Sequence, residues 1–127
     1  MHVLDSSVLV AVMKAEPGSE KLLRFFDGSL MCAVNHSEVL QKMAQLGGSI
    51  EITTALMSRF DFQVVPFDKE LSAETASLWP LTSHKGLSLA DRSCLALARA
   101  MNGIAVTADR AWGILDIPDV TIHVIER

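Results

Sequence analysis

Short apolar runs alternate with longer segments of helical pattern along this chain, and this alternation constrains the fold more than any other feature. The runs that predict strands are Val3–Leu4, Leu30–Val34, Phe62–Phe67, Ile104–Thr107 and Val120–Ile125. Leu30–Val34 is apolar throughout, which is typical of a strand covered on both faces. Strands that alternate with helices favour a mostly parallel sheet between helical layers. We therefore expect an α/β fold, a three-layer α/β/α sandwich.

Helices are predicted in the segments between these runs. Asn35 and Asp68 are predicted N-caps, because Asn and Asp accept hydrogen bonds from free backbone N–H groups at helix starts. The strongest helical pattern runs from Ser88 to Met101. Further helices are predicted over Ser6–Met13, Ser19–Phe26 and Ser49–Phe60, and a short one from Asp109. Pro66 indicates that its strand lies at a sheet edge or ends there.

The length of 127 residues suits a single domain, residues 1–127. Half of the residues are apolar, so a chain of this size can bury a hydrophobic core. No apolar run reaches the length of a membrane span, and the first residues lack the basic region of a secretion signal. Cys32 and Cys94 lie in apolar surroundings and have no partner at metal-ligand spacing. We interpret them as buried thiols of a protein in the reducing cytoplasm.

Four acids stand where helices are predicted to begin: Asp5, Glu38, Asp91 and Asp109. Asp5 and Asp109 follow predicted strands. In open α/β sheets, ligands bind outside the carboxyl ends of the strands, where both of these acids are expected. If all four converge there, they form one acidic site.

Capping offers an alternative explanation for each acid taken singly. An acid near a helix N-terminus gains about 0.3–1 kcal/mol from the helix dipole. Ser88-x-x-Asp91 and Asn35-x-x-Glu38 both have the form of a capping box, loosely defined. Asp68 also opens a helix after a strand, and we interpret it as a cap because its strand is predicted at an edge.

Convergence of the acids would require a cation. Two carboxylates about 5 Å apart repel each other by roughly 3 kcal/mol at an effective dielectric constant near 20. Mg²⁺ and Mn²⁺ prefer hard oxygen ligands. A carboxylate-held cation suits phosphodiester hydrolysis, because it can lower the pKa of a bound water and stabilise charge on the phosphate. The same carboxylates could hold one ion or two.

Other chemistries have weaker support. No glycine-rich phosphate loop is present. Asp5-Ser6-Ser7 after a strand would suit an aspartyl-phosphate nucleophile, but Ser7 occupies the place of the second acid that such enzymes carry. The net charge of −4 argues weakly against broad nucleic-acid binding, although bound cations and a local basic rim can offset it.

The motifs resemble those of the PIN domain, and among its members the VapC-type ribonuclease toxins of toxin–antitoxin pairs. The resemblance rests on four motifs in order: Asp-Ser-Ser at 5–7, Asn-x-x-Glu at 35–38, Ser-Leu-Ala-Asp at 88–91 and Thr-Ala-Asp-Arg-Ala-Trp at 107–112. Together they span nearly the whole chain. Some members carry the fourth acid later, where this chain has Trp112, so that role falls to Asp109.

The resemblance implies a PIN-like sandwich and a metal-dependent endoribonuclease. The acidic quartet would be Asp5, Glu38, Asp91 and Asp109, with Mg²⁺ or Mn²⁺ as cofactor and Ser6 and Thr107 as supporting polar residues. It also implies a homodimer held inactive by a cognate antitoxin.

Basic residues close to these acids in sequence are candidate RNA contacts: Lys85, Arg92 and Arg110. An exposed charge or a salt bridge with a neighbouring acid is the alternative explanation for each, and it is the one that the sequence favours. A PIN-type RNA-processing nuclease, a metal-dependent phosphatase and a non-catalytic PIN-like binding module remain alternatives.

Overall fold

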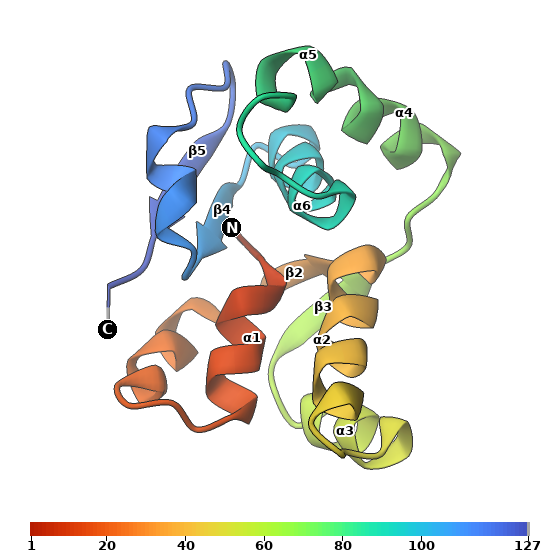
Figure 1. The fold of residues 1–127 in the computed structure, drawn as a ribbon, viewed down its shortest axis with the longest axis vertical. Coiled ribbons are helices and arrows are strands. Elements are labelled where there is room, and N and C mark those ends of the chain that lie inside the picture. Colours follow the sequence, from red (N-terminus) through yellow and green to blue (C-terminus); the bar gives the residue numbers. More distant parts are fainter. Residues whose placement is uncertain (127) are drawn as a thin grey trace.

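The computed structural model describes residues 1–126, and it forms a five-stranded sheet between two layers of helices (Figure 1). The strands are β1 (His2–Leu4), β2 (Ser29–Cys32), β3 (Phe62–Val65), β4 (Ile104–Thr107) and β5 (Thr121–Val124). Their order is β3-β2-β1-β4-β5, and every pair is parallel. The predicted three-layer α/β/α fold is confirmed, and the sheet is parallel throughout.

The helical elements alternate with the strands along the chain. They are α1 (Ser6–Met13), η1 (Ser19–Phe25), α2 (Ala33–Gln45), α3 (Ile50–Met57), α4 (Lys69–Ser77), α5 (Trp79–Thr82), α6 (Leu89–Ala100) and η2 (Arg110–Ile114), with η1 and η2 in the tighter 3₁₀ form. In residues 1–126, no helix is both long and apolar enough to cross a membrane.

Two hydrophobic clusters fill the spaces on either side of the sheet. One contains Leu9, Phe26 and Val39 and lies beneath α1, η1, α2 and α3. The other contains Leu71 and Leu95 and lies beneath α4 and α6, which Figure 1 shows on the opposite side of the sheet. Because both faces are covered, the central strands β1, β2 and β4 consist mostly of apolar residues.

Most predicted boundaries agree with the structure. Ser88 and Asp91 form the predicted capping box of α6. Asp68 accepts a hydrogen bond from the backbone N–H of Leu71, at 2.8 Å, and so caps α4. The strand before Pro66 is an edge strand, as predicted.

The start of α2 was predicted wrongly. The helix begins at Ala33 directly after β2, with Cys32 as its N-cap residue, so Val34 belongs to the helix and not to the strand. Asn35 lies inside the first turn and does not cap it. Its side chain is fully buried and serves a tertiary contact instead. The predicted capping box at Asn35 and Glu38 is therefore absent, and Glu38 lies in the second turn rather than at the helix start.

Candidate metal centre at the carboxyl end of the central strand

Asp5 occupies the middle of the sheet's carboxyl edge. It follows β1, and its backbone N–H donates to the Val106 carbonyl on β4 at 2.9 Å. Asp5 is the N-cap residue of α1, but its side chain makes no capping hydrogen bond. The side chain is only 3% exposed. This buried carboxylate therefore does not serve as the cap of its own helix.

Hydroxyl groups hold one oxygen of this carboxylate. Asp5 Oδ2 accepts hydrogen bonds from Ser7 Oγ at 2.7 Å and from Thr107 Oγ1 at 2.9 Å. Ser7 Oγ in turn accepts the backbone N–H of Ala108 at 2.9 Å, which ties α1 to the end of β4. Asp5 Oδ1 is buried and has no hydrogen-bond partner among residues 1–126. One face of the carboxylate is therefore fixed and the other is free to bind.

Ser6 and Glu38 form the neighbouring contact. Ser6 Oγ donates a hydrogen bond to Glu38 Oε1 and so joins the first turn of α1 to the second turn of α2. Ser6 is buried, whereas Glu38 is partly exposed. Ser6 and Thr107 thus both support an acid, although they support different ones. Ser7, which we had not assigned a role, is the second hydroxyl on Asp5.

Asp91 lies in the first turn of α6 and is partly exposed. Its Oδ2 accepts the backbone N–H of Ser88 at 2.9 Å, and its own N–H donates to Ser88 Oγ at 3.1 Å. The start of α6 is joined to α2 by Asn35, whose Nδ2 donates to the Ala90 carbonyl at 3.0 Å. This buried contact fixes the relative position of the helices that carry Glu38 and Asp91.

The charges of two neighbouring acids act on Asp5. The pKa of Asp5 is raised from its ordinary 3.8 to about 6, mainly by burial and to a smaller extent by the charges of Asp91 and Glu38, while the hydrogen bonds from Ser7 and Thr107 oppose the rise. The structure therefore brings Asp5, Glu38 and Asp91 into one electrostatic neighbourhood. A cation placed among them would relieve both the repulsion and the cost of burying the Asp5 charge.

Asp109 lies beside this group but is directed elsewhere. Its backbone N–H donates to Thr107 Oγ1 at 3.0 Å, which links it to the hydroxyl that holds Asp5. Its carboxylate accepts the N–H of Ala111 at 3.0 Å and caps η2, and the residue is exposed. Asp109 is also not among the charges that raise the pKa of Asp5.

The side chains do not form a closed metal site as they stand. Within residues 1–126, no three His, Cys, Asp or Glu side chains are grouped closely enough to hold an ion. Glu38 is bound by Ser6 and Asp91 by Ser88, so each carboxylate has a protein partner. The donor set still fits a hard divalent cation, because it consists of carboxylate oxygens around the unpartnered Oδ1 of Asp5.

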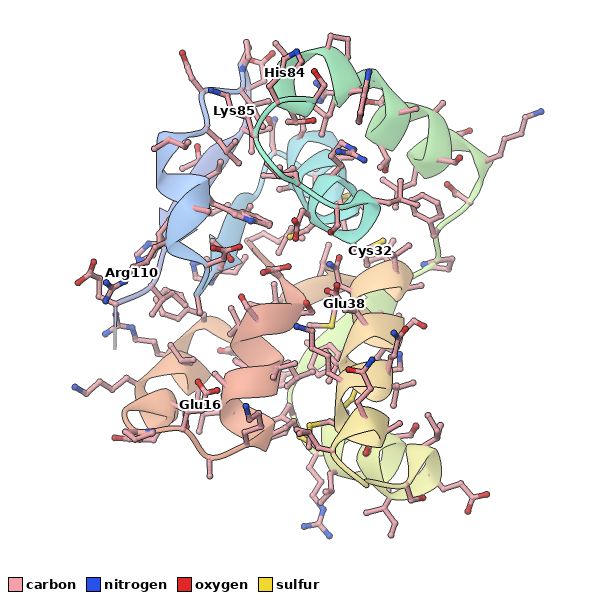
Figure 2. The ribbon with its side chains drawn as sticks, viewed as in Figure 1. Glu16, Cys32, Glu38, His84, Lys85 and Arg110 are labelled. Atoms are coloured by element: carbon pink, nitrogen blue, oxygen red, sulfur yellow. The ribbon has the colours of Figure 1, made fainter. Side chains whose placement is uncertain are left out.

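Figure 2 shows two of the predicted RNA-contact residues, Lys85 and Arg110, in separate parts of the molecule. Arg92 donates to the Leu87 carbonyl at 3.0 Å, and its guanidinium lies 5.0 Å from the ring centre of Trp79. Lys85 is in the loop before α6, and Arg110 opens η2. A basic residue that we did not predict, Lys42, shares a groove of about 570 Å³ with Glu38. The signal for it was its spacing, one helical turn after Glu38.

Solved structures of similar fold include several toxin–antitoxin proteins. A toxin–antitoxin complex from Klebsiella pneumoniae has 16% identity and a TM-score of 0.72, over 98% of this chain and 100% of the other. The VapC20 toxin of Mycobacterium tuberculosis, described as cleaving the sarcin–ricin loop, has 13% identity and a TM-score of 0.75, over 89% and 93%. DNA-bound VapBC from Salmonella typhimurium has 18% identity and a TM-score of 0.73, over 97% and 96%.

At these identities the likeness concerns the fold alone. A comparison with curated proteins finds no match. The PIN domain profile, however, matches residues 2–117, which contain all four predicted acids and nearly every element of the sheet. The chain therefore belongs to the PIN domain family.

Proposed function

We propose that this chain, as a single domain over residues 1–127, is a metal-dependent endoribonuclease and the toxin of a toxin–antitoxin pair. The observation that carries the proposal is the buried Asp5, whose Oδ1 has no partner within residues 1–126 while Glu38 and Asp91 raise its pKa. Such an arrangement is costly for folding unless it serves a ligand. The fold of the VapC20 toxin and of the VapBC complexes supports the toxin assignment.

The proposed cofactor is Mg²⁺ or Mn²⁺, held by Asp5, Glu38 and Asp91, with Asp109 completing the set. When bound, the cation would neutralise charge on the phosphate and lower the pKa of a water. The chain's own residues keep the ligands in place. Ser7 and Thr107 orient Asp5, and Ser6 orients Glu38. Orientation of this kind by neighbouring hydrogen bonds tunes the affinity of metal sites.

The proposed partners are an RNA substrate, a cognate antitoxin and a second copy of the chain, and the proposed location is the cytoplasm. The antitoxin is suggested by solved structures of similar fold, which contain toxin–antitoxin complexes. RNA is suggested by the description of VapC20 as a toxin that cleaves the sarcin–ricin loop.

Cleavage of a labelled RNA by the purified chain tests the proposal. We expect cleavage with Mg²⁺ or Mn²⁺ and none with excess EDTA. Asp5→Asn and Asp91→Asn should each reduce the rate by about 10²-fold or more, which is the scale of losing one electrostatic group from a preorganised site. Asp68→Asn is the matched control, since Asp68 caps α4 and Asn is an equally good cap.

Cleavage at the wild-type rate by both Asp5→Asn and Asp91→Asn would refute the mechanism. Calorimetry that detects no Mg²⁺ or Mn²⁺ binding, together with no cleavage, would favour the non-catalytic binding module instead. Growth arrest on expression, relieved by the product of an adjacent small gene, would support the toxin assignment over an RNA-processing nuclease.

A further inference from the structure

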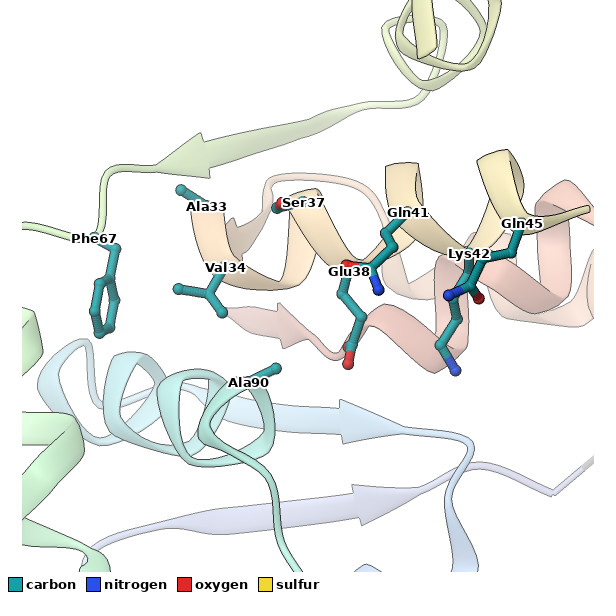
Figure 3. A pocket seen from close by; sticks show the side chains of 9 residues that line it. All are labelled: Ala33, Val34, Ser37, Glu38, Gln41, Lys42, Gln45, Phe67 and Ala90. Carbon is teal, nitrogen blue, oxygen red and sulfur yellow. The ribbon is translucent and has the colours of Figure 1, made fainter. Parts of the chain in front are cut away.

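The groove beside Glu38 has two ends of different chemistry (Figure 3). One end is polar and is lined by Gln41, Lys42 and Gln45. The other is largely apolar and is lined by Val34, Phe67 and Ala90. Glu38 lies between the two ends, as Figure 3 shows. A ligand that fills the groove would therefore pass the acidic centre with a basic side chain on one side and an aromatic ring on the other.

The helix sets the spacing of these contacts. Val34, Glu38 and Lys42 are separated by four residues each, so they lie on one face of α2 at intervals of about 6 Å along its axis. That interval is comparable to the distance between successive phosphates of an extended polynucleotide strand. Lys42 thus lies about one phosphate repeat from Glu38 along the groove.

Lys42 is available to an anion. Its side chain is exposed, and it makes no ion pair with any residue from 1 to 126. Three other basic residues are engaged within the protein: Lys14 lies 3.6 Å from Glu16, Arg99 lies 3.1 Å from Glu74, and Arg92 contacts Trp79. In a chain of net charge −4, an exposed lysine in the same groove as Glu38 can offer a positive charge to a phosphate.

Phe67 provides a surface for a base. It follows the edge strand β3, is half-buried, and packs against the cluster beneath α6. Its neighbours in the groove, Val34 and Ala90, are apolar. Aromatic rings beside basic residues are the usual means of holding single-stranded nucleic acid, because an unpaired base can be turned out to stack on them. The bases of a duplex are already stacked and are not available in this way.

We propose that Lys42 and Phe67 are substrate-binding residues of this groove, with a backbone phosphate of the RNA on Lys42 and a base stacked on Phe67. The proposal rests on the proposed ribonuclease function, to which it adds these two contacts. Lys42 and Phe67 are binding residues here, and the acids remain the reactive centre.

Fluorescence anisotropy with a labelled single-stranded RNA and a duplex of the same sequence provides the test. All variants are made in the Asp5→Asn chain with Mg²⁺ present, so that the RNA stays intact. Lys42→Gln should weaken binding and reduce the slope of log K against log salt by about 0.7, the value for one phosphate contact on a single strand. Lys69→Gln, another exposed lysine, should leave the slope unchanged.

Phe67→Leu should weaken single-strand binding by roughly 5- to 150-fold, the range for one stacked base, whereas Phe67→Trp should retain the binding. Phe62→Leu is the control for the loss of a half-buried ring. Thermal unfolding of each variant separates lost contacts from lost folding. The duplex should bind more weakly than the single strand.

Cleavage by the wild-type chain is measured in parallel. If the wild type cleaves RNA but Lys42→Gln and Phe67→Leu bind as tightly as their parent, the groove proposal fails and the ribonuclease proposal stands. If those variants lose RNA binding but the wild type does not cleave, the ribonuclease proposal alone fails. Unchanged RNA affinity with altered sedimentation of the variants would identify the groove as a protein interface and overturn the RNA proposal.

Discussion

Asp5 and Asp68 occupy equivalent places in the sequence pattern but different places in the molecule. Each follows a parallel strand and is the N-cap residue of the next helix. Asp68 follows the edge strand β3, and its carboxylate caps α4. Asp5 follows the central strand β1, makes no cap, and is held by Ser7 and Thr107.

The roles of these two acids differ because their surroundings in the sheet differ. In the middle of the sheet, β4 brings Thr107 to one side of Asp5, while α2 and α6 bring Glu38 and Asp91 near it. At the edge, Asp68 has a neighbouring strand on one side only, and its own helix is the nearest source of donors.

The largest expected effect is the pH dependence of stability that Asp5 confers in EDTA. Because the pKa of Asp5 is raised from 3.8 to about 6 on folding, the folded protein retains a proton between these pH values that the unfolded chain loses. Stability should therefore fall as pH rises from about 4 to 6. A shift of about two pKa units corresponds to about 3 kcal/mol.

Urea unfolding of the wild type and Asp5→Asn from pH 4 to pH 7 measures this effect. The Asn variant should gain stability relative to the wild type as pH rises, since it carries no charge to bury. Parallel pH profiles for the two proteins would mean that folding does not raise the pKa of Asp5. Asp5 would then not differ from an exposed acid such as Asp68 in the cost of carrying its charge.

A smaller loss is expected for Asn35→Ala, which removes the buried hydrogen bond to the Ala90 carbonyl. The expected destabilisation is about 1–3 kcal/mol, the cost of leaving a buried polar group without this partner. Gln41→Ala, at an exposed position of the same helix, is the control and should change stability by less than about 0.5 kcal/mol. Equal effects in denaturant unfolding would show that the α2–α6 contact does not secure the surroundings of Asp5.

The smallest effect belongs to the cap. Asp68→Ala should lower the free energy of unfolding by about 1 kcal/mol, because the N–H of Leu71 loses its acceptor. Asp68→Asn should keep most of the wild-type free energy of unfolding, because Asn can accept the same hydrogen bond. A failure of Asn to keep it would indicate that Asp68 acts through its charge rather than through its hydrogen bond.

Local signals in the sequence predicted the parts of the fold that depend on local chemistry. The cap at Asp68 and the capping box at Ser88 and Asp91 form between residues three apart, and Pro66 marks an edge strand because of its own missing N–H. The alternation of strands and helices likewise predicted the layers.

Tertiary contacts explain what the sequence did not predict. Asn35 has a strong preference for capping, but a buried bond to Ala90, 55 residues away, outweighs it. Ser7 acts on Asp5 together with Thr107, 100 residues away, and no local pattern distinguishes it from Ser6. Of the four predicted acids, the structure brings three together electrostatically, while the carboxylate of Asp109 is directed to its own helix.

The position of β1 has a consequence for local opening. Amide hydrogen exchange is slowest where backbone groups are bonded on both sides and covered by packed side chains, and fastest where an element can fray alone. Val3 is fully buried and lies between Leu30 and Ala105 of the adjoining strands, whereas β3 and β5 each have an open edge. Transient detachment of an edge strand would leave Asp5 and its hydroxyl partners in register. The candidate metal centre is thus attached to the part of the backbone that should exchange last.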